Sequence, residues 1–322
     1  EGANISPDPA RVMDYSHPQK FTVTSEDGNW HKEYSVIIDT FDLPLRYDFE
    51  HYELNETGKY QVFFEETQGT ALFKQYIWAS GNSGFALTGV GRNPQEYPTV
   101  SIENGIDGSR AIKLETKSTG QFGETVKMPI AAGNLFLGSF DVNNAVQKPL
   151  KATRFGLPFG KKPLQLKGYY KYTPGTQPFK AKDKNGNTVT IPGQEDEGDI
   201  YAVLYEAAEL DGQALDGNNV LTSKNIVALA RVEVEKKDEF TAFHVDFHYG
   251  SRIPIDWPKF IRDQRDPSDD GTGKYLRFSE EKMKNYEYNL AVVFTSSKYG
   301  AYFAGSVGST LCIDKVEIVC EK

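Results

Sequence analysis

The stretch GSTLCIDKVEIV at residues 308–319 decides the fold class of this chain. Its apolar residues alternate as they do in a strand with one buried face, and the alternation changes parity at Asp314 and Lys315. Such a change inside a strand predicts a β-bulge, in which one extra residue is inserted opposite the partner strand of a twisted antiparallel sheet. We therefore predict that the chain closes as a strand of a β-sandwich.

The composition favours an all-β protein. The 322 residues include 18 Tyr, 20 Phe and 29 Gly, which suits pleated strands joined by tight turns. Segments with helical periodicity are scarce, and the best of them, residues 279–288, is short. The length allows one large β-domain and something smaller.

Runs typical of strands recur along most of the chain. Each run has the length of a strand and is rich in β-branched or aromatic residues. The runs lie at 110–116, 164–172, 200–206, 226–234, 240–249 and 288–296. Two long excursions interrupt them: residues 172–199, with a hairpin turn at 184–187, and the polar stretch 250–284. Loops of this length are usually functional or mobile, so both are candidates for the walls of a pocket.

Charge and cysteine content argue against some classes of protein. The net charge of −9 and the isoelectric point near 5.2 disfavour a nucleic-acid partner, because phosphate contacts require clustered Lys and Arg. No apolar run approaches the ~20 residues that a membrane helix needs. Cys312 and Cys320 would lie ~26 Å apart on a continuous strand, too far for a disulfide, so we expect two free thiols.

The first 42 residues differ from the rest. Strand-like runs at 20–24 and 33–38 flank a turn with Asp27 and Gly28 at its tip, which predicts a β-hairpin. This pattern resembles the closing hairpin of the small immunoglobulin-like modules that open many surface lipoproteins of polysaccharide-degrading bacteria. We predict a small immunoglobulin-like β-domain, or its C-terminal part, at 1–42 and a second domain at 43–322.

Eight ordered segments carry a further resemblance. They are IWASGNSGFAL (77–87), EYPTV (96–100), AIKLETKSTG (111–120), AAGNLFLGSF (131–140), KATRFGLPF (151–159), LKGYYKYTPG (166–175), DIYAVLYE (199–206) and VVFTSSKYGAYFAGSVGSTLCIDKVEI (292–318). Together they resemble the putative carbohydrate metabolism domain of gut Gram-negative anaerobes, over residues 45–322.

This resemblance implies properties that the residues alone do not establish. They are a jelly-roll β-sandwich, export to the outer-membrane surface or periplasm as a lipoprotein, and a role in glycan use. An oligo- or polysaccharide is then the expected ligand, other outer-membrane glycan-uptake proteins are the expected partners, and we expect a monomer. The family has no agreed catalytic residues, so none is carried over.

Aromatic residues beside polar side chains form a first candidate sugar site. Sugar rings stack their C–H faces on aromatic rings, while their hydroxyls need amide, carboxylate or guanidinium partners. Trp78 with Asn82 in a Gly/Ser-rich turn offers both, and Tyr97 and Tyr172 are candidates to join them. The alternative interpretation is that these aromatic rings fill the core of the sandwich.

The segment His244-x-Asp246-x-His248 is a second candidate site. Residues two apart on a strand point to the same face, so the three polar side chains share one face and Phe243 and Phe247 lie on the other. That polar face is first of all the solvent side of a half-buried strand. A sugar-binding groove and a transition-metal site are the other two interpretations.

Two charged positions stand next to apolar runs. Arg154 lies in TRFG, and Glu206 ends a strongly apolar strand. Buried charges need partners, so we expect these two to pair with each other or with Asp246. A structural salt bridge and a ligand contact are equally compatible with this pattern.

A structural calcium site is the one cofactor site that the sequence suggests. Glu50 near the start of the large domain and Asp314 on its last strand would meet if the first and last strands pair. Carboxylate oxygens are the ligands that Ca²⁺ prefers, although two acids fall short of the usual six to eight oxygens. We expect no other cofactor.

Glycan binding is the leading functional hypothesis. The predicted site combines Trp78, Asn82, Tyr97, Arg154, Tyr172, His244, Asp246 and His248 on the concave face of the jelly roll. The first alternative is a glycoside hydrolase that uses Glu206 and Asp246, a carboxylate pair from different strands. The second is a structural adhesin without a small-molecule site.

Overall fold

The computed structural model describes residues 2–9, 19–36, 42–68, 72–210, 213–265 and 272–322. The chain divides into two compact units, Glu1–Leu43 and Pro44–Lys322. Among the helices of the described residues, none has the length and apolar character needed to cross a membrane.

The first unit contains a three-stranded antiparallel sheet. Its strands are β1 (Asn4–Ser6), β2 (Gln19–Thr24) and β3 (His31–Val36), in that order across the sheet. The predicted hairpin is confirmed, and its turn is held by a hydrogen bond from Ser25 Oγ to Asp27 Oδ1. The immunoglobulin-like character of this unit stays a prediction.

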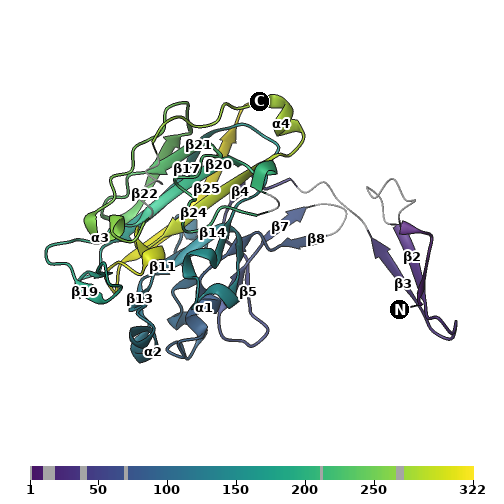
Figure 1. Ribbon diagram of the computed structural model, residues 1–322, viewed down its shortest axis with the longest axis horizontal. Helices are drawn as coiled ribbons and strands as arrows, with labels where there is room; N and C mark the ends of the chain where they lie inside the picture. Colours follow the sequence, from purple (N-terminus) through teal and green to yellow (C-terminus); the bar gives the residue numbers. More distant parts are fainter. Residues whose placement is uncertain (1, 10–18, 37–41, 69–71, 211–212, 266–271) are drawn as a thin grey trace. The chain divides into compact units, whose positions relative to one another are not determined.

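The second unit is a β-sandwich, as the sequence predicts (Figure 1). The first sheet has six strands, in the order β10 (Thr99–Ile102), β11 (Ala111–Glu115), β25 (Thr310–Cys320), β17 (Pro163–Thr173) and β22 (Lys237–Asp246), with β4 (Arg46–Tyr47) beside β25. The second sheet has eight, in the order β15 (Thr153–Phe155), β14 (Asn134–Phe140), β24 (Tyr288–Thr295), β20 (Asp199–Glu206), β21 (Ile226–Val232) and β23 (His248–Tyr249), with β9 (Trp78–Ala79) beside β14 and β16 (Leu157–Pro158) beside β24.

Short elements connect and cover these sheets. The two-stranded pairs are β5 (Tyr52–Leu54) with β6 (Gln61–Phe63), β7 (Glu65–Gln68) with β8 (Leu72–Gln75), β12 (Lys117–Ser118) with β13 (Ile130–Ala131), and β18 (Lys180–Lys182) with β19 (Thr188–Thr190). The α-helices are α1 (Asn82–Ala86), α2 (Gly120–Thr125), α3 (Lys259–Arg262) and α4 (Glu280–Lys284). The 3₁₀ turns are η2 (Pro94–Glu96), η3 (Ile106–Gly108), η4 (Val142–Asn144), η5 (Pro149–Lys151), η6 (Ala208–Leu210) and η7 (Gly300–Tyr302).

The last strand contains the predicted bulge. Lys167 of β17 pairs with Glu317, and Tyr169 pairs with Asp314, so two steps along β17 face three along β25. Lys315 adopts a φ of 45° there, which takes up the extra residue. The parity change at Asp314 and Lys315 is thereby explained. The two cysteines are free thiols, as expected.

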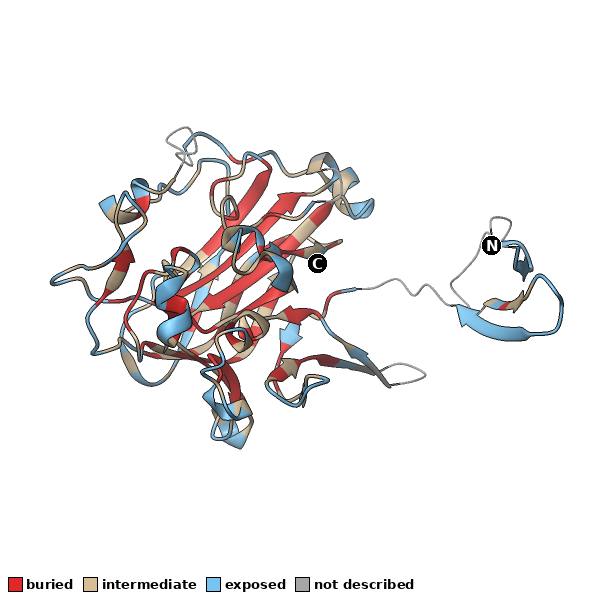
Figure 2. Ribbon diagram, turned by 60° about the horizontal axis from the view of Figure 1, so that its bottom comes forward, coloured by how far each residue is buried: buried red, intermediate tan, exposed pale blue. Residues whose placement is uncertain are grey.

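The second sheet is buried on both faces. All eight residues of β20 are buried, and its neighbour β24 is buried along nearly its whole length (Figure 2). The inner face packs in the sandwich, where Phe294 contacts Phe49 and Trp78. The outer face is covered by long loops, which contribute Leu215, Val220 and Tyr275 to a second apolar cluster. These loops determine where a ligand can reach the sheet.

Candidate functional site

Trp78 lies in the core of the sandwich, so the predicted role in sugar stacking is wrong. Its side chain is 4% exposed and packs against Tyr47, with ring centroids 5.0 Å apart. Its indole Nε1 donates a hydrogen bond to Glu65 Oε1 at 2.7 Å. Because β9 pairs with β14 at the register Leu137↔Trp78, the indole is directed between the sheets.

Glu65, the partner of Trp78, makes stability depend on pH. Burial raises the pKa of Glu65 to about 7, although the hydrogen bond from Trp78 acts against this. Between the ordinary pKa of 4.5 and about 7, the folded protein keeps a proton that the unfolded chain loses. The contribution of Glu65 to stability is therefore complete below pH 4.5 and is lost as the pH rises to about 7.

We expect Glu65→Gln to remove this dependence. Between about pH 4 and about pH 8, the free energy of unfolding of the wild type should fall relative to that of the variant by about 3 kcal/mol. Urea denaturation at the two pH values measures this difference. Glu66→Gln, at an exposed neighbouring position, is the matched control. A parallel pH response of wild type and Glu65→Gln would contradict the prediction.

The other predicted contacts of this sugar site are buried as well. Asn82 is fully buried, where its Nδ2 donates to Thr99 O at 2.8 Å and its Oδ1 accepts from Thr99 N at 3.1 Å. Tyr97 and Tyr172 are 1% and 2% exposed. For the two tyrosines, the alternative interpretation as core residues is correct, and Tyr97 packs against Phe85 with ring centroids 5.5 Å apart.

The polar face of residues 244–248 is a solvent-exposed face. His244, Asp246 and His248 are exposed, and Phe243 and Phe247 are buried, which confirms the alternation. However, His248 lies on β23 and pairs with β21 of the second sheet, whereas the other two lie on β22 of the first. The described residues contain no group of three or more His, Cys, Asp or Glu that could hold a metal ion.

The predicted pairing among Arg154, Glu206 and Asp246 is wrong. Arg154 Nη2 lies 3.2 Å from Asp141 Oδ2, and Glu206 binds Lys282. Asp246 Oδ1 accepts a hydrogen bond from Gln165 Nε2 at 2.8 Å on the first sheet. Glu206 lies buried on the second sheet, so the proposed hydrolytic pair of Glu206 and Asp246 is not formed.

The two predicted calcium ligands, Glu50 and Asp314, accept hydrogen bonds from groups of the protein. Asp314 is fully buried, and its Oδ2 accepts from Ile106 N at 2.7 Å and from Ser109 Oγ at 2.9 Å. Glu50 Oε1 accepts from Arg110 N at 3.0 Å. Both carboxylates therefore fasten the 105–110 loop to the sandwich, because that loop carries backbone N–H groups that need acceptors.

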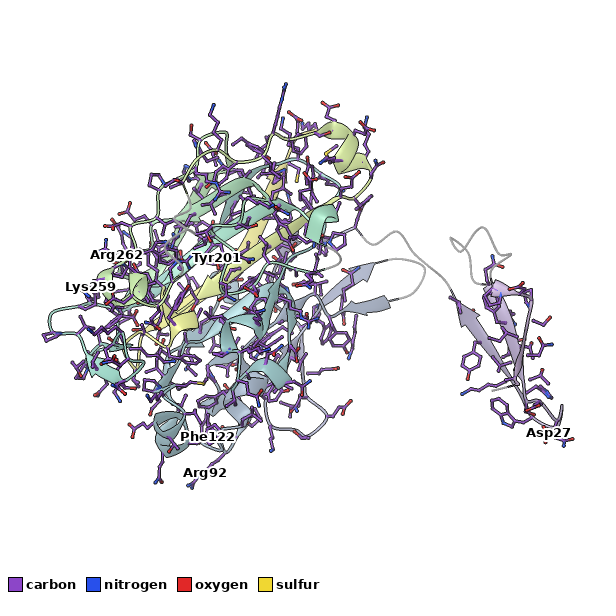
Figure 3. The ribbon with its side chains drawn as sticks, in the orientation of Figure 1. Asp27, Arg92, Phe122, Tyr201, Lys259 and Arg262 are labelled. Atoms are coloured by element: carbon purple, nitrogen blue, oxygen red, sulfur yellow. The ribbon has the colours of Figure 1, made fainter. Side chains whose placement is uncertain are left out.

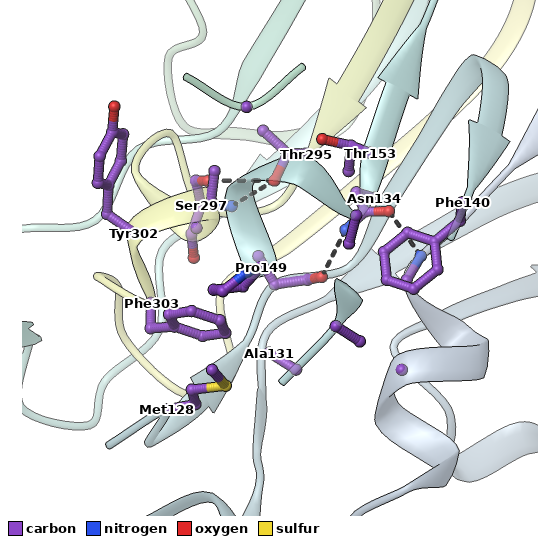
Figure 4. Close-up of a pocket in the computed structure, with 18 of the residues that line it drawn as sticks. Met128, Ala131, Asn134, Phe140, Pro149, Thr153, Thr295, Ser297, Tyr302 and Phe303 are labelled. Carbon is purple, nitrogen blue, oxygen red and sulfur yellow. Dashed lines mark hydrogen bonds between the residues drawn. The ribbon is translucent and has the colours of Figure 1, made fainter. Parts of the chain in front are cut away.

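A cavity of about 200 Å³, here called the cleft, lies against the outer face of the second sheet (Figure 4). Side chains of β14, β20 and β24 form its floor, among them Phe136, Tyr201 and Val293. Its walls come from α1, α2 and the segments 145–153, 217–222 and 297–303, together with Trp257 and Arg265. Figure 3 labels Tyr201 over the sheet and Phe122 on α2, two of the lining residues.

Aromatic rings are accessible in the cleft. Phe140 and Phe303 are half-buried, and Phe122 is 41% exposed. Phe303 adopts a left-handed backbone conformation with φ 56° and ψ 34°, and Lys182 Nζ lies 4.6 Å from its ring centroid. This left-handed conformation is energetically unfavourable for a residue other than glycine. Residues with such strained backbones cluster at binding sites.

Two charged residues that line the cleft, Asp199 and Lys298, form ion pairs. At the floor, Arg231 donates to Asp199 Oδ1 at 2.9 Å and to Oδ2 at 2.7 Å, in a buried bidentate pair. In the wall, Lys298 Nζ lies 2.7 Å from Glu197 Oε2. Within the described part of the chain, no hydrogen-bond partner is found for the buried Thr153 Oγ1, which lines the cleft.

None of these cleft residues is among the predicted site residues. The cleft is assembled from segments spread over residues 81–303, and only the sheet order brings them together. Two sequence signals nevertheless point to it. Asp199 and Arg231 are opposite charges in neighbouring apolar strands, and Gly300 and Gly305 flank an aromatic pair in the segment GAYFAG.

The chain is similar to two proteins of known structure. No curated protein matches this sequence. A crystal structure from Bacteroides thetaiotaomicron, described as a putative glycoside hydrolase, is similar with 42% identity and a TM-score of 0.72, over 100% of this chain and 84% of that one. A second, from Bacteroides vulgatus and described in the same words, has 35% identity and a TM-score of 0.69, over 88% of this chain and 100% of that one.

A family match agrees with these structures. The family described as the putative carbohydrate metabolism domain matches residues 48–319, most of the second unit. It is the family that the eight ordered segments of the sequence resemble. This chain therefore belongs to the putative carbohydrate metabolism domain family.

Proposed function

We propose that this protein binds a glycan in the cleft. The observation that carries the proposal is the combination, in a carbohydrate metabolism domain, of accessible aromatic rings with a buried hydroxyl that has no partner among the described residues. The rings of Phe122, Phe140 and Phe303 suit the C–H faces of sugars. In an apolar cavity, a small number of polar groups at defined positions determines the orientation of the ligand.

Glycoside hydrolysis is the second candidate function. It is favoured by the two similar crystal structures, which are both described as putative glycoside hydrolases. Hydrolysis by the usual route needs two carboxylates. Asp199 is the single carboxylate among the described lining residues, and Arg231 holds it in a bidentate pair. This arrangement supports binding as the primary proposal.

Thr153→Val tests the binding proposal. The substitution removes the unpartnered hydroxyl at nearly constant volume, so we expect stability to be kept while glycan affinity falls about tenfold. Calorimetry of the full chain against a panel of defined oligosaccharides measures the affinity. Thr188→Val, at an exposed position of β19, is the matched control and should bind as the wild type does.

The same panel separates the two candidates. Chromatography of each mixture after incubation reports any released sugar. Binding without release supports the primary proposal, and release supports hydrolysis. Absence of binding to every oligosaccharide would contradict both. Export to the cell surface and partnership with glycan-uptake proteins remain proposals that rest on the family resemblance.

A further inference from the structure

We propose that the cleft selects a sugar unit that carries a methyl or acetyl substituent, as in a 6-deoxy or acetylated sugar. This inference rests on the proposed glycan binding and specifies its substrate class. It follows from the chemistry of the cleft wall, which offers carbon surface at most positions and uses its own polar atoms inside the protein.

Beside the aromatic rings, part of the carbon surface is aliphatic and made of small side chains. It includes Ala131, Ala132, Val146, Pro149, Ala152 and Val293. These residues come from separate segments, and Val293 stands on β24 in the floor. A wall of methyl and methylene groups gains by covering a methyl group, because apolar surface is then removed from water on both sides.

Asn134, Thr295 and Ser297 of the wall already use their polar side chains in hydrogen bonds within the protein. Asn134 Oδ1 accepts from Gly81 N at 2.8 Å, and its Nδ2 donates to Ala132 O at 3.2 Å. Thr295 Oγ1 donates to Ser297 O at 3.1 Å, and Ser297 Oγ donates to Asp196 Oδ2 at 2.6 Å. A sugar hydroxyl placed against this wall would lose its water without gaining a partner, which is unfavourable.

Two buried polar atoms of the lining are exceptions. Thr153 Oγ1 and Trp257 Nε1 are buried, and the described residues supply no hydrogen-bond partner for either. Both residues line the cleft, and Arg265 lies over the Trp257 ring at 4.3 Å from the centroid. A sugar oxygen that accepts from Trp257 Nε1 and a second one that bonds to Thr153 Oγ1 are enough to orient a sugar ring. The apolar substituent of the sugar then lies on the aliphatic part of the wall.

Matched pairs of sugars test the inference by calorimetry on the full chain. Chitotetraose is compared with cellotetraose, and an α-L-fucoside with the corresponding α-L-galactoside. In the first pair, an acetamido group replaces the C2 hydroxyl of every sugar unit, and in the second pair a methyl group replaces the hydroxymethyl group at C5. In at least one pair, we expect the member with the methyl group to bind about tenfold more tightly or better.

Two variants locate the selectivity in the wall. Val293→Thr adds a hydroxyl to the floor of the cleft. It should lower the ratio of the two affinities, that of the sugar with the methyl group over that of its hydroxylated counterpart, severalfold towards one. If this variant does not fold, Ala301→Ser places a hydroxyl at an exposed position of the lining and should lower the ratio in the same direction. An unchanged ratio in the folded variants would overturn the assignment of selectivity to this wall.

The remaining outcomes each decide a different claim. Equal or tighter binding of the fully hydroxylated member in both pairs would overturn the inference and leave the proposed glycan binding intact. Binding of n-octanol with no affinity for any sugar would identify an apolar ligand that is not a glycan, and would overturn both. If other oligosaccharides bind but neither pair does, a methyl or acetyl group is not what the cleft selects, and the inference falls alone.

Discussion

Trp78→Ala is expected to lower the free energy of unfolding by about 3–5 kcal/mol. The substitution opens a cavity among Tyr47, Phe49 and Phe294, which all contact the indole. It also leaves the buried Glu65 without the donor that it binds at 2.7 Å. Urea denaturation, followed by fluorescence and by circular dichroism, measures the loss.

Trp30→Ala is the matched control for this effect. Trp30 is 53% exposed in the first unit, so its replacement should change the free energy of unfolding by less than about 0.5 kcal/mol. If Trp78→Ala were as stable as the wild type and had instead lost glycan affinity, the position of Trp78 in the core would be refuted.

Asp199→Ala should destabilise the protein by a similar amount, about 3–5 kcal/mol. Its carboxylate and the Arg231 guanidinium form a bidentate pair on the floor of the cleft, with side chains 4% and 17% exposed. Removing one partner leaves a buried charge without compensation, and this cost exceeds the value of the pair itself. Thermal and urea unfolding both report it.

The double variant Asp199→Ala with Arg231→Met distinguishes an ion pair from two independent residues. We expect it to recover most of the stability that Asp199→Ala loses, because no unpaired charge remains. The exposed pair of Lys259 and Asp263 is the control, and Asp263→Ala should cost less than about 0.5 kcal/mol. A double variant less stable than the single one would contradict this account.

Much of the fold follows from local pattern. Alternation along residues 308–319 predicts the bulge, and the structure places it at Lys315. The turn residues at 184–187 predict the hairpin there, and alternation predicts the exposed face of His244 and Asp246. These predictions succeed because the pleat of a strand fixes which side chains share a face, whatever the strand packs against.

The site does not follow from local pattern. The sequence marks Trp78 and Tyr172 as candidates for sugar stacking, but the structure buries both between two sheets. Phe303 is not among the predicted site residues, yet its ring is accessible in the cleft. An aromatic ring is a core residue or a ligand platform according to what covers it, and the covering layer comes from elsewhere in the chain.

The sequence by itself therefore determined the strands, their exposed and buried faces, the bulge in the last one and the family. Only the tertiary structure decided which aromatic rings reach a ligand, which charges pair and where the cleft lies. Asp199 and Arg231 are 32 positions apart, and the cleft joins segments from residue 81 to residue 303. The physical reason is that alternation is a property of neighbouring residues, whereas burial is created by the order of strands in the two sheets.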